Sequence, residues 1–314
     1  MVELNKIPHI DEISNHGAFA GARQKKTATF RERYLQQNKV VPSLEDAIRR
    51  TGLKDGMTIS FHHHFRNGDH IINMVVDKLA EMGYKNLTLA ASSLTSVHAP
   101  LVQHIKNGVI THIETSGLRG ELAEEISRGL MDCPVVFRSH GGRASAIRSG
   151  ELHIDVAFLG APSCDPYGYP NAPWAIPEYD VDYVVLTDDI GDPKGIMSGA
   201  TRYTKDPKEL LIAKTAANII EATGYLYDGF SMQMGSGGAS LATARFLRQK
   251  MIDQGIHCRF ALGGITGQIT AMHEEGLIDR VLDVQSFDLD AALSLKNNHF
   301  HHQIGATYYA SHMI

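Results

Sequence analysis

The chain has 314 residues, a formal net charge of −5 at pH 7, 43% hydrophobic residues and 21% charged residues. This composition is typical of a folded globular protein, and the length favours about two domains. The acidic balance argues against nucleic-acid binding, which usually requires a basic domain. Cys133, Cys164 and Cys258 are far apart and form no CxxC pair, so neither a zinc knuckle nor a disulfide framework is predicted.

The first residues contain no apolar signal core, and no apolar run in the sequence approaches the length of a membrane span. We therefore expect a cytoplasmic protein with reduced thiols and no membrane partner. Residues 1–42 carry little periodicity and are interpreted as an amino-terminal arm. The arm is locally basic, which is consistent with a solvated surface or with docking of an acidic partner.

A helix is predicted to begin after Ser43, which can cap it, and this opens a first α/β domain over residues 43–224. Strands then alternate with helices, which predicts a parallel sheet. The apolar segment 154–159 is expected at the centre of that sheet. The predicted strands are 57–61, 86–91, 109–114, 134–138 and 154–159, and the predicted helices are 69–82, 98–107 and 121–128.

The alternation breaks in the proline-rich stretch 161–177 and resumes with a strand over 182–187. A strong helix signal follows: Asp206 as cap, Pro207 in the first turn, Glu209 completing a capping box, and Gly224 as stop. We place a domain boundary at Gly224, with a second α/β domain over 225–314.

The order of elements then recurs at a nearly constant offset. The strand, glycine-bearing loop and helix over 57–83 recur over 230–255, and residues 87–95 match 258–266 in pattern. This indicates two related α/β halves and not a solenoid, whose repeats are shorter. The second copy ends at Ile314 after few strands, so we expect it to be incomplete.

Three glycine-bearing segments follow predicted strands, where open α/β sheets bind ligands. Residues 234–240 (MGSGGAS) precede a helix and favour either an anion or oxyanion site or a tight packing turn. Residues 139–143 (SHGGR) suit a phosphate or carboxylate, or form a turn whose Arg143 faces solvent. Residues 262–266 (LGGIT) form the third segment.

Histidines are frequent, and the run His62-His63-His64 suggests a metal site at first sight. On a strand, His62 and His64 share one face, which supplies only two ligands, and no HExxH motif occurs. A polar loop beside a substrate cleft is the favoured interpretation, and no metal is predicted. No GxSxG elbow is present, and spacing alone selects no catalytic residue.

Longer strings of the sequence resemble the citrate lyase alpha chain family over nearly the whole chain, in order. They are FHH (61–63), SGLRG (116–120), LAEEISRG (122–129), SHGGR (139–143), DVAFLG (155–160), PKELLIA (207–213), GGASLA (237–242), FALGGIT (260–266) and LDVQSFD (282–288).

The resemblance implies a CoA-transferase-like (NagB/RpiA-type) α/β fold of two related halves. It also implies a citrate CoA-transferase subunit that exchanges acetyl for citryl on the CoA-like thiol of an acyl carrier chain. The implied partners are the citrate lyase beta and gamma chains in an oligomeric complex. No covalently bound cofactor is implied, and the substrates are citrate and CoA or the carrier's prosthetic group as acetyl and citryl thioesters.

By this resemblance, the loop Gly235, Ser236, Gly237 and Gly238 is expected to stabilise a thioester oxyanion through its backbone N–H groups. The remaining candidates for binding substrate or CoA follow from chemistry, since citrate carries three carboxylates. They are His62, Arg119, His140, Gly141, Gly142, Arg143, Gly263 and Gly264.

Two departures from the family affect these expectations. Family chains continue beyond Ile314, where related transferases place the acyl-accepting glutamate, so no catalytic nucleophile is named. A glycine-rich insert of the family is absent between Pro173 and Trp174. The alternatives are a non-catalytic assembly or CoA-ligand-binding module, and a sugar-phosphate isomerase of related fold.

Overall fold

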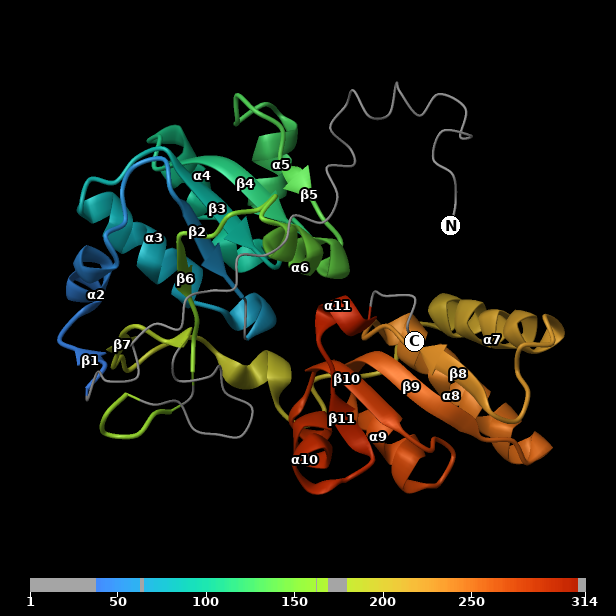
Figure 1. Cartoon of the computed structure of the whole chain (residues 1–314). Coiled ribbons are helices and arrows are strands. Elements are labelled where there is room, and N and C mark those ends of the chain that lie inside the picture. The colour runs from blue at the N-terminus through green and yellow to red at the C-terminus, as the bar shows by residue number, and fades with distance from the viewer. Residues whose placement is uncertain (1–37, 63–64, 162, 169–179, 310–314) are drawn as a thin grey trace, which may run out of the picture.

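The computed structural model describes residues 38–62, 65–161, 163–168 and 180–309. Their strands form a five-stranded, a four-stranded and a two-stranded sheet (Figure 1). Every strand pair within these sheets is parallel. The predicted α/β class with parallel sheets is therefore confirmed. Most of the predicted arm, and the pair His63 and His64, lie outside the described residues.

The five-stranded sheet has the order β5-β4-β3-β2-β6. Its strands are β2 (Thr58–Phe61), β3 (Leu87–Ala91), β4 (Ile110–Thr115), β5 (Val136–Phe137) and β6 (Val156–Phe158). The prediction that 154–159 forms a central strand is wrong, because β6 pairs only with β2 at the edge. Its apolar character comes from packing instead: the Phe158 ring stacks on Phe61 with centroids 5.5 Å apart.

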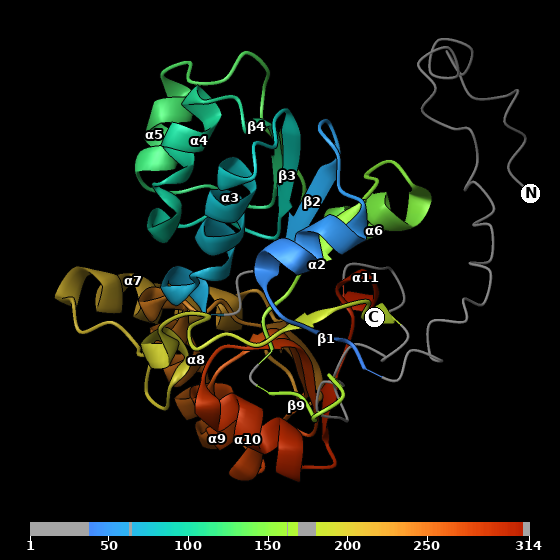
Figure 2. The same ribbon diagram turned by 90° about the vertical axis from the view of Figure 1, so that its left-hand side faces the viewer.

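Helices cover both faces of this sheet. Figure 2 shows α3, α4 and α5 on one side of the strands and α6 on the other. The helical elements of this half are α2 (Leu44–Thr51), η3 (Arg66–Gly68), α3 (Ile71–Glu81), η4 (Ser96–His98), α4 (Leu101–Lys106), α5 (Glu121–Ser127) and α6 (His140–Ser149). The helix predicted over 69–82 is confirmed as α3, and its apolar stripe is buried: Ile71, Ile72, Val75, Val76 and Leu79.

Side chains along a strand alternate between the two faces of its sheet. Ile59, Phe61 and Leu89 belong to the large core that includes α3 and α4. Ala90, on the opposite face, packs with Ala146 of α6. This alternation decides which polar groups at the strand ends can meet α6.

The two-stranded sheet pairs β1 (Val40–Val41) with β7 (Val184–Val185), which joins residues directly before α2 to the segment after the proline-rich stretch. A turn, η6 (Pro193–Ile196), follows β7 and packs against η3. The contact is close: the Asp192 N–H donates to the Gly68 carbonyl at 2.8 Å, and a Cβ on Gly68 would lie 2.1 Å from the Asp192 carbonyl oxygen.

The four-stranded sheet has the order β11-β10-β9-β8 and a separate core. Because its strands follow one another in space as they do in sequence, right-handed crossovers place α8, α9 and α10 on one face. Its elements are β8 (Phe230–Gln233), α8 (Gly238–Gln254), β9 (Cys258–Ile265), α9 (Gly267–Glu274), β10 (Val281–Ser286), α10 (Leu289–Asn297), β11 (His301–Gln303) and α11 (Ala306–Tyr309).

Helix α7 (Pro207–Ala222) precedes this sheet and begins as predicted, with the Asp206 carboxylate accepting from the Glu209 N–H at 2.9 Å. The helix packs on α8 and contributes Ala217 to the second core. The boundary predicted at Gly224 would assign α7 to the first domain. From this packing we propose instead that the division falls before α7.

Several contacts join the two halves. The Arg66 guanidinium lies over the Phe287 ring, 5.0 Å from its centroid. Ser198 donates to Asp290 at 2.8 Å, and the Thr204 N–H donates to the Gly238 carbonyl at 3.0 Å. Helix α11 also packs against α6 (Figure 1). The segment between β7 and α7 therefore touches the carboxyl ends of both larger sheets.

Candidate functional site

The carboxyl ends of β2 and β3 place a polar pair on the face covered by α6. His62 directly follows β2, and Ser92 directly follows β3. Because side chains alternate, His62 lies on the same face as Ser60, and Ser92 on the same face as Ala90. His62 Nδ1 lies 2.8 Å from Ser92 Oγ. The predicted site residue His62 thus faces α6 and is held by the neighbouring strand.

Arg143 of α6 reaches onto the same face of the sheet. Its Nη2 group donates to Ser60 Oγ at 2.9 Å and to the Ala90 carbonyl at 3.1 Å. Ser60 and Ala90 each stand two residues before the polar pair, so the guanidinium lies on the same face of the sheet as His62 and Ser92, about 7 Å further back along the strands. Of the two alternatives for this segment, a turn whose Arg143 faces solvent is wrong, because the side chain is partly buried against the sheet.

The charge of Arg143 is incompletely compensated. Among the described residues no carboxylate lies within ion-pair distance of its guanidinium, and its Nε and Nη1 groups make no hydrogen bond there. Burial lowers the pKa of Arg143 below its usual value, while the negative charge of Glu114 acts in the opposite direction. A guanidinium stays charged in proteins. Arg143 is therefore a partly buried cation with donors available to an anion.

Arg138, five residues earlier, has a different role. It donates to Glu114 at 2.8 Å and to Glu151 at 2.9 Å, and these bonds raise its pKa. Two carboxylates thus neutralise Arg138 and fix the end of β5 beside β4. Arg138 is therefore paired with carboxylates, whereas Arg143 has no carboxylate partner among the described residues.

The two glycines of the same segment belong to the first turn of α6. Ser139 caps the helix by accepting from the Gly142 N–H at 2.9 Å, and a Cβ on Gly142 would lie 2.9 Å from Ser139 Oγ. Gly141 is buried and His140 is exposed. The amide of Gly142 is therefore already used by the cap.

Arg119 lies on the loop that connects β4 to α5. The loop is held to the one after β3, since the Arg119 N–H donates to the Leu94 carbonyl at 3.1 Å. The Arg119 side chain is exposed. Arg119 therefore lies at the carboxyl end of the sheet with an accessible side chain.

The glycine loop predicted at 235–238 connects β8 to α8, at the carboxyl end of the second sheet. Gly237 is the N-cap of α8, with φ −71° and ψ 150°, and no side chain caps the helix. The Gly237 N–H makes no hydrogen bond with any residue that the structure describes. Backbone amides at an uncapped helix N-terminus favour anions. Ser236 is partly buried, and Gly238 is in contact with Thr204.

Gly263 and Gly264 do not form a loop, because both lie within β9. A Cβ on Gly264 would lie 1.8 Å from the Phe287 ring, and a Cβ on Gly263, where φ is +110°, would lie 3.1 Å from the Gln233 side chain. The pairing of β9 with β10 is irregular at this point. The prediction that this segment follows a strand is wrong, because the two glycines lie inside the strand, where they allow this close packing.

The sequence patterns did not identify two buried pairs of polar side chains. His98 and Asp69 are fully buried, with Nε2 and Oδ2 3.5 Å apart, between η4 and the start of α3. His301 Nε2 lies 3.2 Å from Asp283 Oδ2, and its Nδ1 lies 3.0 Å from Ser294 Oγ. Both pairs join segments distant in sequence, and no local motif marks them.

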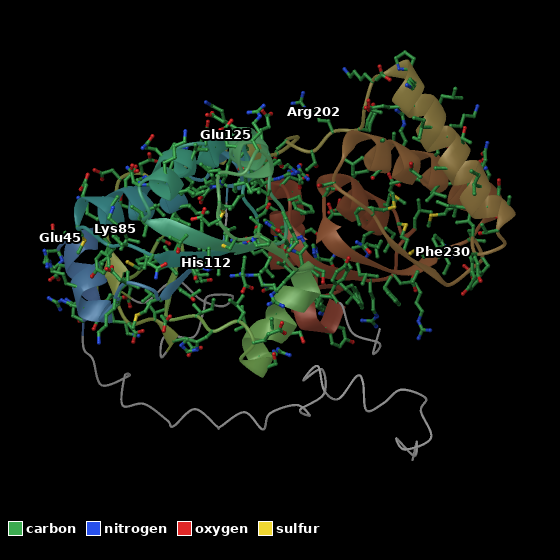
Figure 3. The ribbon with its side chains drawn as sticks, turned by 90° about the horizontal axis from the view of Figure 1, so that it is seen from above. Glu45, Lys85, His112, Glu125, Arg202 and Phe230 are labelled. Atoms are coloured by element: carbon green, nitrogen blue, oxygen red, sulfur yellow. The ribbon has the colours of Figure 1, made fainter. Side chains whose placement is uncertain are left out.

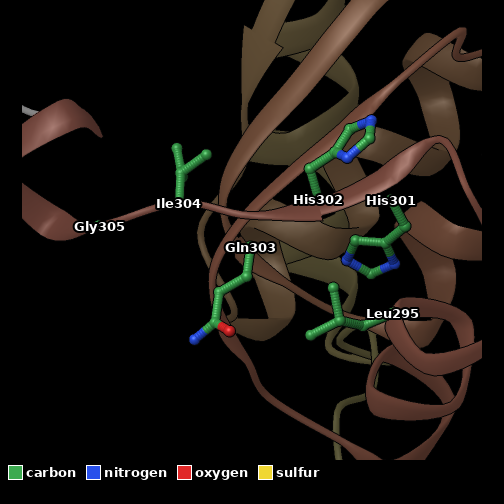
Figure 4. A pocket seen from close by; sticks show the side chains of 6 residues that line it. All are labelled: Leu295, His301, His302, Gln303, Ile304 and Gly305. Atoms are coloured by element: carbon green, nitrogen blue, oxygen red, sulfur yellow. The ribbon is translucent and has the colours of Figure 1, made fainter. Parts of the chain in front are cut away.

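A hollow of about 490 Å³ lies beside β11 (Figure 4). It is lined by Leu295, His301, His302, Gln303, Ile304 and Gly305. None of these is a predicted site residue.

Within the described part of the chain, no three His, Cys, Asp or Glu side chains are placed to hold a metal ion. No helix there has both the length and the apolar character needed to cross a bilayer.

The described residues thus form an α/β protein with two larger parallel sheets, and candidate anion-binding groups lie at the carboxyl ends of both. The family model of the citrate lyase alpha subunit (CitF) matches residues 37–168 and 166–313. The chain belongs to the citrate lyase alpha subunit family.

Curated relatives agree with this assignment. The citrate lyase alpha chain of Klebsiella pneumoniae is 51% identical over 329 aligned positions, which cover 93% of this chain and 65% of the relative. That of Haemophilus influenzae is 51% identical and that of Escherichia coli 50%, with 63% and 62% of their lengths covered. This chain therefore spans less than two thirds of the relatives it matches.

A solved structure from Streptococcus mutans, a putative citrate lyase alpha subunit in complex with citrate, is 50% identical with a TM-score of 0.83. The match covers 88% of this chain and 62% of that one. A Pseudomonas malonate decarboxylase hetero-tetramer with malonate is 15% identical with a TM-score of 0.59, over 81% of this chain and 53% of that one. The second likeness concerns the fold alone.

Proposed function

We propose that this chain is the citrate CoA-transferase subunit of a citrate lyase. It exchanges acetyl for citryl on the CoA-like thiol of an acyl carrier chain. Membership of the citrate lyase alpha subunit family is the main support. The observation that carries the proposal in this chain is Arg143, a partly buried guanidinium with no carboxylate partner among the described residues.

The reaction is a thioester exchange. The C–S bond between acetyl and the carrier breaks, and a C–S bond to a carboxyl carbon of citrate forms. One oxygen of that citrate carboxylate leaves on acetate, so that citryl carrier and free acetate are the products. Negative charge develops on the thioester carbonyl oxygen, and a transferase must supply donors to it.

Each group of the candidate site suits one part of this exchange. Arg143 binds a carboxylate of citrate through its Nε and Nη1 groups, and the nearby His62 donates to a second carboxylate. The amides of the loop at Gly235–Gly238 donate to the developing oxyanion, each contributing about 3 kcal/mol. Arg119 on the surface contacts the incoming carrier chain. No residue is assigned as the nucleophile.

The two sheets share an order of elements that supports a CoA-transferase-like (NagB/RpiA-type) fold of two related halves. In each, a helix precedes the sheet and three strands follow in spatial order with helical crossovers. We further propose a cytoplasmic complex with citrate lyase beta and gamma chains. CoA or the carrier's prosthetic group acts as substrate, and no cofactor is covalently bound. The citrate in the Streptococcus mutans structure supports citrate as the second substrate.

Mass spectrometry of the products tests the proposal. The purified chain is incubated with acetyl-CoA and citrate, and we expect citrate-dependent formation of citryl-CoA together with acetate. Citrate binding without citryl-CoA would indicate a binding module and contradict the transferase. Interconversion of sugar phosphates without thioester exchange would indicate an isomerase.

A further inference from the structure

The loop after β2 contains one residue in a backbone conformation that its side chain disfavours. Arg66, the first residue of η3, has a φ of +57°. Within the described residues, only Arg66 and Asn86 combine a Cβ atom with a positive φ. Asparagine adopts this left-handed region readily, whereas a long side chain such as arginine rarely does. Backbone strain of this kind gathers at functional sites, so Arg66 is a candidate functional residue.

Neighbouring segments hold the loop in this conformation. Asn67 Oδ1 accepts from the Val97 N–H at 3.1 Å. On the other side, the Gly68 carbonyl accepts from the Asp192 N–H at 2.8 Å. The strain at Arg66 is therefore maintained by contacts that do not involve its own side chain.

The Arg66 side chain joins the carboxyl ends of the two larger sheets. Arg66 follows β2, and Phe287 directly follows β10. The guanidinium lies over the Phe287 ring, 5.0 Å from its centroid. The ring is itself fixed, because a Cβ on Gly264 would lie 1.8 Å from it and because the Phe287 N–H donates to the Ile265 carbonyl at 2.8 Å. Phe287 is therefore a firm support for the cation.

The contact with Phe287 leaves the hydrogen-bond donors of Arg66 unused. Among the described residues no carboxylate lies within ion-pair distance of its guanidinium, and its side chain donates no hydrogen bond to them. A guanidinium over a ring keeps its in-plane N–H groups for a planar carboxylate. On a partly exposed ring, the contact returns no more free energy than a left-handed backbone costs. Packing of the two halves therefore does not by itself account for an arginine at this position.

Arg66 lies where both halves carry candidate anion-binding groups. His62, at the end of β2, stands four residues before it. In the second half, the loop Gly235–Gly238 follows β8, and only β9 separates β8 from β10. Two strand spacings place that loop about 10 Å from Phe287 along the same edge of the sheet. Open α/β sheets bind ligands at such edges.

The charge of the proposed substrate favours a second cation. Citrate carries three carboxylates, and Arg143 supplies one permanent positive charge. Arg138 cannot contribute, because Glu114 and Glu151 already neutralise it. Arg66 is permanently charged and has no carboxylate partner among the described residues.

We propose that Arg66 binds a carboxylate of the acid substrate and so contributes to specificity for a tricarboxylate. Phe287 is a positioning residue, because it touches the guanidinium and not the substrate. The inference rests on the proposed function and extends it to a residue that no sequence motif singled out. It also explains why an arginine occupies a left-handed position that glycine or asparagine would adopt without strain.

Calorimetric titration of citrate into the whole chain tests the assignment. Arg66→Gly removes the guanidinium and relieves the backbone strain, since glycine adopts a positive φ freely. We expect the Kd for citrate to rise about 30-fold, as for loss of a charge-assisted hydrogen bond. The urea midpoint should stay at or above that of the parent chain, because strain relief offsets the added freedom of the unfolded chain. An unchanged Kd, or a rise that accompanies a lower urea midpoint, overturns the proposal.

Asn86→Gly is the matched control. Asn86 has a φ of +59°, is exposed and directly precedes β3, at the opposite edge of the parallel sheet from Arg66. Figure 3 shows Lys85, its neighbour in the sequence, on the side of the first half that faces away from the second half. We expect Asn86→Gly to bind citrate like the parent chain. An equal loss in both variants would assign the effect to the backbone change and contradict a role for the guanidinium.

Analogues of citrate that lack one carboxylate test the contact itself. The compound 3-hydroxyglutarate lacks the central carboxylate, and citramalate lacks a terminal one. For the analogue without the carboxylate that Arg66 binds, Arg66→Gly and the parent chain should have Kd values within about twofold of each other. A 30-fold difference that persists with both analogues contradicts the carboxylate contact. So does a variant that loses affinity for CoA and keeps its affinity for citrate.

These measurements detect binding, which separates this inference from the proposed function. A parent chain that binds citrate through Arg66 but forms no citryl-CoA would contradict the transferase and support the role of Arg66. Formation of citryl-CoA with the same citrate affinity in Arg66→Gly would contradict the role of Arg66 alone. A parent chain that does not bind citrate would contradict both.

Discussion

Arg143 Nη2 donates to Ser60 Oγ at 2.9 Å and so connects α6 to the strand that ends at His62. Ser60 and Arg143 are 83 residues apart in the sequence, and their contact places a cation on the sheet face that also carries the polar pair of His62 and Ser92. If this arrangement binds citrate, replacing Arg143 with methionine should reduce kcat/KM for citrate by about 100-fold, since charge-assisted hydrogen bonds contribute about 1.5–3 kcal/mol each.

The control is Arg148→Met, on the exposed last turn of the same helix. Initial rates of citryl-CoA formation over a range of citrate concentrations provide the comparison. We expect Arg148→Met to behave like the parent chain. Equal losses in both variants, or an unchanged KM for citrate in Arg143→Met, would show that Arg143 does not bind the substrate.

The Gly237 amide allows a separate test of oxyanion stabilisation. With φ at −71°, Gly237 has a backbone conformation that proline also adopts, but proline removes the N–H. Gly237→Ala keeps the N–H, and an added Cβ meets no atom within 4 Å. If this amide donates to the oxyanion, Gly237→Pro should lower kcat about 100-fold or more, while Gly237→Ala stays near the parent value. Comparable activity of the two variants would assign the oxyanion contact elsewhere.

Asp288 secures the carboxyl end of the second sheet. It is buried and accepts from the Gly267 N–H at 3.0 Å, the Ala291 N–H at 2.9 Å and the Thr201 hydroxyl. Asp288→Ala should lower the free energy of unfolding by about 2–4 kcal/mol, because it removes a helix cap and leaves buried donors unpaired. Urea denaturation measures the loss. The exposed Glu274→Ala serves as control, and an equal effect there would argue against this role.

Gly264 tests the packing of β9 against Phe287. A methyl group on Gly264 would lie 1.8 Å from the ring, so Gly264→Ala should destabilise the chain by about 1–3 kcal/mol. Phe287→Leu, combined with it, should restore part of the loss. Gly305→Ala, where an added Cβ meets nothing within 4 Å, should be nearly neutral. Thermal unfolding compares the variants, and a neutral Gly264→Ala would contradict the close contact.

Cys258 predicts a specific dependence of stability on pH. Burial raises the pKa of the Cys258 thiol from 9.0 to about 12 in the folded chain. The unfolded chain therefore loses this proton at a lower pH than the folded chain. Titration of Cys258 leaves the free energy of unfolding unchanged below about pH 9 and lowers it as the pH rises from about 9 toward about 12. The slope is about 1.4 kcal/mol per pH unit in that window.

The measurement is urea unfolding of the parent chain and of Cys258→Ala between pH 8 and about pH 10.5. Other groups titrate in both proteins, so the difference between the two curves isolates Cys258. We expect Cys258→Ala to lose less stability than the parent as the pH rises. Parallel curves would show that the thiol is not protonated above its ordinary pKa.

Local signals predicted most helices and strands of the fold. Ser43 caps α2 and Asp206 caps α7, as their sequence positions indicated. The stripe on α3 is buried because its 3.6-residue period matches one helix face. The order of the strands in the sheet is harder to predict from the sequence. β6 is apolar enough for a central strand, yet it lies at the edge, and only tertiary packing decides between the two positions.

The sequence predicts individual residues of the candidate site, but it does not predict their positions relative to one another. Arg143 and His62 were selected by chemical type, whereas their proximity depends on strand alternation and on α6 lying across β2 and β3. The sequence predicts a ligand loop at Gly263 and Gly264, because glycine pairs at strand ends often form one. Phe287, which explains Gly264, is 23 residues away and carries no sequence signal for that contact.

Oxygen transfer from citrate to acetate tests the proposed exchange most directly. With citrate labelled with ¹⁸O in its carboxylates and acetyl-CoA as donor, multiple turnovers should release acetate that carries ¹⁸O, because the leaving acetate takes its oxygen from citrate. Mass spectrometry of the acetate reads the label. Unlabelled acetate would mean that water attacks the thioester, which would contradict the transferase function.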